Sequence, residues 1–200
     1  MKTIVERITR ACFAKTYTVH SDRTIVLLIA GRKKQEIRIY VKCNKPGSRA
    51  DIVGVVVGND NDHITLHTLQ HHKQPDATSN LIVKSLLTGN ASFVYDGAIR
   101  VEPKAQKTDA YQRNENLLLS DKAHVESKPK LEILANDVRC THGATTGSVR
   151  EDELWYLATR GIAKKEATYL IAQGFLESVV IKITDPRAQS QVYSFIDHAV

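Results

Sequence analysis

The chain has 200 residues, which suits one domain, or one domain with a small appendage, and is ample for a sizeable core. Hydrophobic residues make up 42% and charged residues 25%, which describes an ordinary soluble globular protein. No apolar run reaches the roughly 18 residues that a membrane span needs. The N-terminal stretch MKTIVERITR also lacks the apolar segment of a signal peptide, so the composition argues against a membrane protein.

The cysteines and the charge distribution narrow the class further. Three cysteines stand far apart, at positions 12, 43 and 140, and this odd number argues against a disulfide framework, so we expect a reducing cytosol. The net charge of +6 is concentrated in residues 1–60, which carry twelve Lys and Arg against five Asp and Glu. This basic part lacks interleaved aromatic residues for base stacking, so we expect a solvated face and no nucleic-acid binding.

From residue 16 to about residue 140, short apolar runs alternate with turn signals. β-branched residues crowd the runs, whereas Gly, Asn, Asp and Pro crowd the breaks. No stretch has a sustained apolar stripe of 3.6-residue period, so the region is predicted to be all-β. The runs are Thr24–Ala30, Glu36–Val41, Ile52–Val57, Ile64–Leu69, Leu81–Leu87, Ser92–Tyr95, Ala98–Val101, Asn116–Leu119 and Leu131–Val138.

Nine short strands at close spacing fit a sandwich, a barrel or a parallel β-helix. Hairpin turn signals are scarce, and Asp96-Gly97 is the one clear example. Several connections instead look like polar corners between strands of similar length, which favours the stacked rungs of a β-helix. No sharp repeat period separates the three architectures.

At Ser148 the pattern changes to helical. Ser148 and Glu151 have the spacing of a capping box, which predicts a short helix that begins here and ends at Gly161. A second helix is predicted over about 163–183, and Asp185-Pro186 reads as the N-cap and first position of a third. The aromatic pair Trp155-Tyr156 at the start of this part is either exposed aromatic surface or part of the core, and the core is the favoured expectation.

The segment 108–147 contains the one Cys-x-His pair of the chain, Cys140 and His142. The mostly period-two pattern of 131–136 favours a strand that we expect to continue through this pair. In an extended chain the thiol and imidazole project on the same side, with Cα atoms roughly 6.6 Å apart. Both could then bind one metal centre or face one partner. The alternative is a buried cysteine beside a turn histidine.

Other constellations are weaker. Four histidines, at positions 63, 67, 71 and 72, suggest a metal site, but their spacing matches no regular ligand framework. The chain has no Gly-rich phosphate loop of the Walker or dinucleotide type, so it is not expected to hydrolyse nucleotide itself.

Three long stretches of this sequence resemble the SufB/SufD family of iron–sulfur cluster assembly proteins. They are HHKQPDATSNLIVKSLLTGNASFVYDG at 71–97, TDAYQRNENLLLSDKAHVESKPKLEILANDVRCTHGAT at 108–145 and ELWYLATRGI at 153–162. The motif CTHGAT at 140–145 is similar to the SufD branch. The resemblance implies a mainly β fold, a right-handed parallel β-helix over 1–147 followed by a small C-terminal helical domain over 148–200.

The resemblance also implies a scaffold subunit, not an enzyme, that pairs with SufB and with the ABC-type ATPase SufC. The transient iron–sulfur cluster is expected at the SufB–SufD interface, with Cys140 and His142 as this chain's metal ligands. SufC is expected to dock on the helical domain, and a flavin in the complex stays open. The residues expected to contact the partner are Leu154, Trp155, Leu170 and Phe175.

Two departures from the family pattern bear on these expectations. Family members are usually about twice this length and carry an N-terminal helical region, so the chain is a fragment or a short member, for which a homodimer is also plausible. Residues 120–130, where SufB proteins have a further cysteine, contain none. The chain therefore offers at most two of the four ligands that a cluster commonly needs. A polysaccharide-acting β-helix enzyme and a purely structural assembly partner stay open as alternatives.

Overall fold

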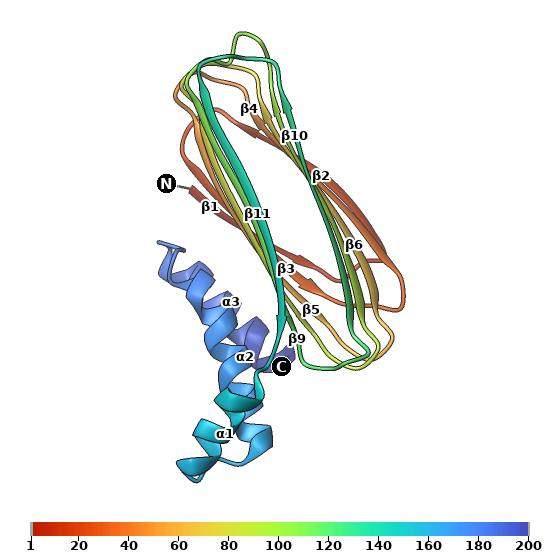
Figure 1. Ribbon diagram of the computed structural model, residues 1–200. Helices are drawn as coiled ribbons and strands as arrows, with labels where there is room; N and C mark the ends of the chain where they lie inside the picture. Colours follow the sequence, from red (N-terminus) through yellow and green to blue (C-terminus); the bar gives the residue numbers. More distant parts are fainter. Residues whose placement is uncertain (1, 200) are drawn as a thin grey trace.

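The computed structural model describes residues 2–199, which form strands followed by helices. Along the chain, the helical part begins only after the last strand (Figure 1). The strands are β1 (Lys2–Ile8), β2 (Cys12–Val19), β3 (Arg23–Ala30), β4 (Gln35–Cys43), β5 (Arg49–Gly58), β6 (His63–His72), β7 (Thr78–Leu87), β8 (Ser92–Val101), β9 (Thr108–Leu118), β10 (His124–Ile133) and β11 (Val138–Ser148), and the helices are α1 (Glu151–Thr159), α2 (Lys164–Val180) and α3 (Pro186–Ala199).

The strands form two parallel sheets that face each other (Figure 1). The odd-numbered strands make one sheet in the order β1-β3-β5-β7-β9-β11, and the even-numbered strands make the other in the order β10-β8-β6-β4-β2. Each strand pairs in parallel with the strand two positions along the chain, so each rung consists of one strand from each sheet. This confirms the predicted parallel β-helix.

The predicted hairpin turn at Asp96-Gly97 is wrong. Both residues lie inside β8, which joins the predicted runs 92–95 and 98–101 into one strand. The glycine serves a close approach, because a Cβ at Gly97 would lie 2.5 Å from Nε2 of Gln112 on the opposite sheet.

Strand boundaries also differ at both ends of the β region. The β structure begins at Lys2 and not at residue 16. The first strands, β1 and β2, lie at the ends of their sheets, and their side chains are mostly half-buried or exposed with no long apolar run. The extended segment expected from 131 through 142 is interrupted between Ile133 and Val138, where the chain turns from β10 into β11.

The interior of the solenoid is filled by aliphatic side chains stacked in register. Ile25, Ile52 and Leu81 occupy equivalent positions on β3, β5 and β7, and each is at most 1% exposed. Burial of such a side chain stabilises the fold by about 1.5–3 kcal/mol. Because each rung repeats the same contacts, the stack forms one large apolar cluster, and a second, smaller cluster lies among residues of β8, β9 and the adjoining loops.

The helices pack on the outer face of the odd-numbered sheet. Val53, Val55 and Leu86 of that face share a hydrophobic cluster with Leu176 of α2 and Phe195 of α3. The figure shows α2 and α3 running beside this sheet, with α1 farther from it (Figure 1). The division into a core at 1–147 and a helical domain at 148–200 stays a prediction. No helix within residues 2–199 has the length and apolar character that crossing a membrane requires.

The predicted helix starts are partly confirmed. Ser148 remains in β11, so the expected capping box is wrong by two residues: α1 is capped at Arg150, whose N–H donates to the Glu153 carboxylate at 3.4 Å. The N-cap at Asp185 is present, and its carboxylate accepts from the N–H of Arg187 at 2.9 Å. The second helix, α2, is shorter at both ends than the predicted 163–183.

A buried lysine fixes α2 to the sheet. Lys84 is 7% exposed, and its ammonium donates to the carbonyl of Phe175 at 2.8 Å and to Oγ of Ser178 at 2.6 Å. The same group pairs with Oε2 of Glu115 on β9 at 2.7 Å and lies 4.1 Å from the Phe175 ring centroid. One charge thus joins α2, β7 and β9.

Lys84→Ala should destabilise the protein by roughly 2–4 kcal/mol, because it removes the buried donor from the α2 acceptors and leaves Arg113 as the partner of the Glu115 carboxylate. Lys84→Met, which replaces the charge with an apolar chain of similar length, together with Glu115→Gln should recover most of that loss. Urea unfolding of the single and double variants checks this. Equal stability of wild type and Lys84→Ala would contradict it.

A histidine is enclosed in the solenoid core. His72 is fully buried, and its Nε2 is 2.7 Å from Oγ of Ser79. Burial, with a smaller contribution from the neighbouring His71, lowers the pKa of His72 to about 4. The folded protein therefore keeps His72 neutral at a pH where the unfolded chain, with an ordinary pKa near 6.5, takes up a proton.

We expect His72 to make stability fall as the pH drops from about 6.5 to about 4, because the unfolded state alone gains the proton in this window. The loss should be about 3 kcal/mol. The check is to measure unfolding free energy against pH for wild type and His72→Leu. The unfolding free energy of wild type minus that of His72→Leu should fall by about 3 kcal/mol toward low pH, and parallel curves would contradict the assignment.

Candidate functional site at the open end of the solenoid

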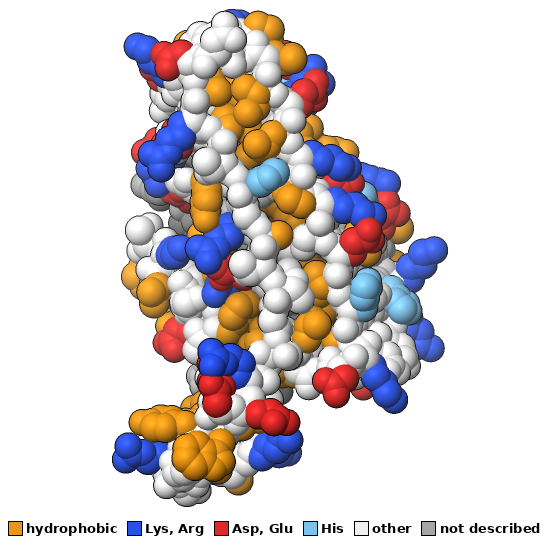
Figure 2. Space-filling model, in the orientation of Figure 1, with side chains coloured by type: hydrophobic (Ala, Val, Ile, Leu, Met, Phe, Trp, Pro, Cys, Tyr) orange, Lys and Arg blue, Asp and Glu red, His pale blue; other side chains and the backbone are white. Residues whose placement is uncertain are grey.

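Two strands at one end of the solenoid have free edges. Within residues 2–199, β11 pairs only with β9 and β10 pairs only with β8. The end formed by β10 and β11, which we call the open end, faces the viewer in Figure 1. Figure 2 shows hydrophobic side chains and a histidine exposed on this face, with most charged groups nearer its rim. Free strand edges of this kind offer backbone N–H and C=O groups to another strand.

Cys140 and His142 both lie on β11 and project toward the interior. Their register partners on β9 are Ala110 and Gln112, both of which point into the solenoid and are at most 1% exposed. The expectation that thiol and imidazole share one side of a strand is therefore met. Since no further rung covers β11, His142 is exposed although it faces inward.

Cys140 is half-buried against a small apolar cluster that includes Ile99, Val101 and Ala110. This burial raises the pKa of the Cys140 thiol, and the nearby Asp109 carboxylate raises it further, while a hydrogen bond with the Ala110 backbone opposes the shift. The thiol is therefore protonated near neutral pH. Metal ligation requires the thiolate, so binding at this position would release a proton.

At the open end, this chain places one thiol and one imidazole, those of Cys140 and His142. Among the described residues no group of three or more His, Cys, Asp and Glu side chains is arranged to hold a metal ion. A thiol and an imidazole are donor types that suit iron, and they amount to two of the four ligands that an iron–sulfur cluster commonly has.

The four-histidine group does not form a metal site. Nδ1 of His63 is 2.6 Å from Oγ of Ser92, and Nε2 of His71 is 2.7 Å from Oε1 of Glu102. His67 has Asp96 as a neighbour at 3.4 Å. These three histidines alternate along β6 on its outer face, whereas His72 lies in the core, so the group is divided between two faces of one strand.

A row of buried polar side chains lies on β9, inside the last rungs of the solenoid, and was not identified from the sequence. Asn116 donates to the carbonyl of Thr145 on β11 at 3.0 Å, and Asn114 accepts from Ser127 on β10 at 2.6 Å. These bonds hold both edge strands against the rungs before them. Together with Gln112, the asparagines occupy every second position of β9, a period-two pattern of buried polar residues that resembles an exposed strand face in sequence.

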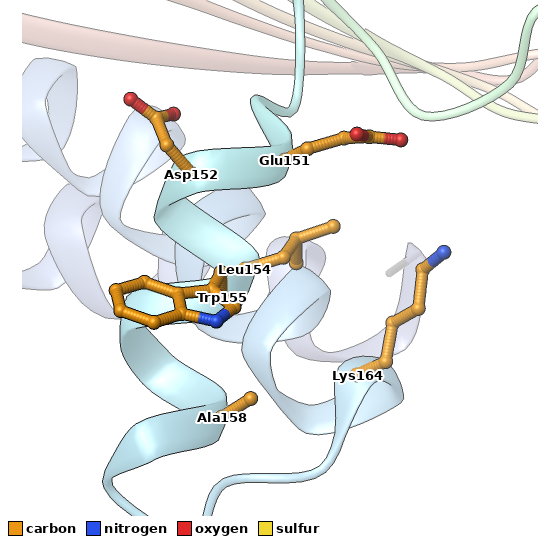
Figure 3. Close-up of a pocket in the computed structure, with 6 residues that line it drawn as sticks. All are labelled: Glu151, Asp152, Leu154, Trp155, Ala158 and Lys164. Atoms are coloured by element: carbon orange, nitrogen blue, oxygen red, sulfur yellow. The ribbon is translucent and has the colours of Figure 1, made fainter.

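The helical part exposes apolar groups away from the solenoid. Trp155 is 71% and Tyr156 55% exposed, so their expected place in the core is wrong: α1 contributes no buried residue to it. Leu154, Trp155 and Ala158 line a shallow groove that reaches Lys164 at the start of α2 (Figure 3).

The four residues expected to contact a partner differ in how far their side chains are exposed. Leu170 is 42% exposed, and Leu154 is half-buried. Phe175 instead packs against the sheet beside Lys84 and is part of the internal contacts. Trp155 and Leu170 are therefore the more accessible of the four.

Comparison with known proteins gives consistent matches. A family model described as the SufBD core domain of the SUF system for FeS cluster assembly matches residues 15–175. An iron–sulfur cluster assembly SufBD family protein of Mycobacterium leprae is 29% identical over 181 residues, covering 86% of this chain and 46% of that protein. SufD of Escherichia coli is 33% identical over 136 residues, covering 68% and 32%. SufD of Plasmodium falciparum is 25% identical over 176 residues, covering 88% and 12%.

The chain thus spans less than half the length of each of these three relatives. The family match nevertheless covers most of the solenoid and reaches α2, and so includes the strands that carry Cys140 and His142. The resemblance stated from the sequence is confirmed, and the chain belongs to the SufB/SufD family of iron–sulfur cluster assembly proteins.

Proposed function

We propose that this chain is a SufD-like scaffold subunit that completes an iron–sulfur assembly site only when a SufB-type partner covers its open end. The observation that carries the proposal is the position of Cys140 and His142, side by side on a free edge strand with their side chains turned inward. Two possible ligands at a free strand edge can be joined by further ligands from a second chain that pairs with that edge.

Pairing would proceed through backbone hydrogen bonds at the edges of β10 and β11. An added strand satisfies the free backbone groups and brings side chains of the partner over the open end. At the open end, Leu131 and Ile133 of β10 are 39% and 38% exposed, so pairing with another chain would also bury apolar surface. A homodimer through the same edges would supply a second copy of Cys140 and His142.

The cargo would be iron and sulfide, held transiently between the two chains. Cys140 would bind as thiolate and His142 as neutral imidazole, both favourable donors for iron. The raised pKa of Cys140 means that loading releases a proton. We assign no flavin to this chain, because a thiol, an imidazole and amides at the open end suit a metal and not an isoalloxazine ring.

The ATPase partner is proposed to dock on the helices through Trp155 and Leu170, with Leu154 in the adjoining groove. Nucleotide-driven movement of that partner would shift α1 and α2 and strain the paired edge, a two-state switch driven from outside the chain. Three thiols without disulfide partners fit a reducing cytosol.

Cys140→Ser and His142→Ala should each lower iron and sulfide uptake by the paired complex, because each removes one of two donors that this chain contributes. Stability should change little for His142→Ala, which is exposed, and by about 1 kcal/mol for Cys140→Ser, which is half-buried. Anaerobic reconstitution with measurement of iron content and visible absorption, beside thermal unfolding, tests this.

Cys12→Ser is the matched control, since that thiol is exposed on β2 at the opposite end of the solenoid. It should leave uptake unchanged. Full assembly in both site variants would exclude ligation by this chain. A loss of assembly that follows an equal loss of stability would support the purely structural alternative instead.

For ATPase docking, deletion of residues 149–200 would expose the apolar sheet face that α2 and α3 cover, so surface substitutions are the sharper test. Trp155→Ala combined with Leu170→Ala should weaken SufC binding at least tenfold, because truncation of a central aromatic anchor costs about 2 kcal/mol or more. Ile181→Ala, at an equally exposed apolar residue beyond α2, is the control. Isothermal titration with purified SufC gives the affinities, and unchanged binding by the double variant would refute the docking site.

A further inference from the structure

Gln112 is an unusual residue for the interior of this solenoid. Its side chain is 1% exposed, yet neither Oε1 nor Nε2 has a hydrogen-bond partner. A buried amide loses its hydrogen bonds to water and here gains none in return, so a leucine or methionine at this position would make a more stable core. The position therefore retains a polar group at the expense of stability.

Gln112 lies on β9, one strand in from the free edge of β11. Gln112 is the register neighbour of His142, one strand away, at a spacing of about 4.8 Å between strands, and both side chains point into the solenoid. Across the interior, the amide approaches Gly97, where a Cβ would collide with Nε2. Glycine at 97 thus leaves room for this amide in the interior.

An inward imidazole next to a free amide has a specific chemical use. A histidine that ligates a metal through one ring nitrogen almost always donates its other ring N–H to an acceptor, which fixes the tautomer and the orientation of the ring. The amide oxygen of Gln112 is a buried acceptor without a donor, on the residue that pairs in register with His142. The nitrogen that remains would face the free edge.

We propose that Gln112 is a positioning residue for His142: rotation of the exposed imidazole brings its ring N–H to the free amide oxygen of Gln112, and the other ring nitrogen is left as a lone-pair donor at the open edge. The inference rests on the proposed function for the identity of the cargo. The hydrogen bond belongs to this chain alone and can be measured without iron or a partner.

The test compares Gln112→Met, which has a similar length and no hydrogen-bonding amide, with Gln70→Met. Gln70 is also a buried glutamine of the interior, but its amide donates to Oγ of Ser79 at 2.7 Å and to the carbonyl of Tyr111 at 3.2 Å. The ¹⁵N chemical shifts of the histidine ring nitrogens, assigned with His142→Ala, report the tautomer in the isolated full chain at a pH where His142 is neutral.

Wild type and Gln70→Met should show His142 mainly in one tautomer, whereas Gln112→Met should show a mixture. Gln112→Met should also unfold at the same or a higher temperature, while Gln70→Met should unfold at a lower one. Gln112→Glu, which keeps an acceptor oxygen, should restore the single tautomer. In the paired complex, Gln112→Met should weaken iron binding about tenfold to a hundredfold.

A wild-type tautomer population in Gln112→Met would overturn the inference, whatever happens to iron uptake. So would a fall in unfolding temperature as large as that of Gln70→Met with the tautomer unchanged, because Gln112 would then be a structural residue. If the tautomer shifts in Gln112→Met but His142→Ala leaves cluster assembly intact, the positioning role stands and the proposed function fails. The two hypotheses are thus tested separately.

Discussion

The rest of the structure depends on the parallel backbone ladder, in which each strand pairs with the strand two positions along the chain. Such a ladder satisfies the backbone groups of every interior strand but never those of the last ones, because a solenoid does not close on itself. The free edges of β10 and β11 are therefore a consequence of the fold. A residue pair on the last strand can face inward and still meet another molecule, as Cys140 and His142 do.

The same ladder explains why movement of the helices could reach the open end. β11 ends at Ser148 and α1 begins at Glu151, so the strand that carries Cys140 and His142 continues almost directly into the helical part. A second connection runs from α2 through Lys84 to Glu115, whose register partner on β11 is Thr145. Helices that were merely tethered to the solenoid would lack this second path. The chain connection therefore acts on β11 directly, and the Lys84 connection acts on β7 and β9, the strands of the same sheet that lie behind it.

The features that the sequence predicts correctly are those that depend on interactions between residues close together in the chain. The apolar runs of β3 to β7 and the capping of α3 at Asp185 depend on nearby residues and are readable from pattern alone. The hairpin prediction at Asp96-Gly97 is wrong because the glycine is needed for close approach of Gln112 from the opposite sheet. A contact between two sheets leaves no signal in the local sequence. Trp155 was expected in the core because large aromatic residues are usually buried, but α1 packs too far from the sheet to cover it.

The candidate site divides in the same way. Cys140 and His142 could be chosen from their spacing and from the family motif, but their inward direction and the free edge required the register of β11 on β9. The polar residues of β9 could not be recognised, since Gln112, Asn114 and Asn116 have the pattern of an exposed strand face and are buried only because another rung lies opposite. Asn114 and Asn116 are hydrogen-bonded to the edge strands and so contribute to stability. The side chain of Gln112 has no hydrogen bond within the fold, so its buried amide does not contribute to stability in this way. Such a group calls for another explanation. The polar side chain nearest to it in register is the imidazole of His142, and we attribute the amide to the positioning of that ring.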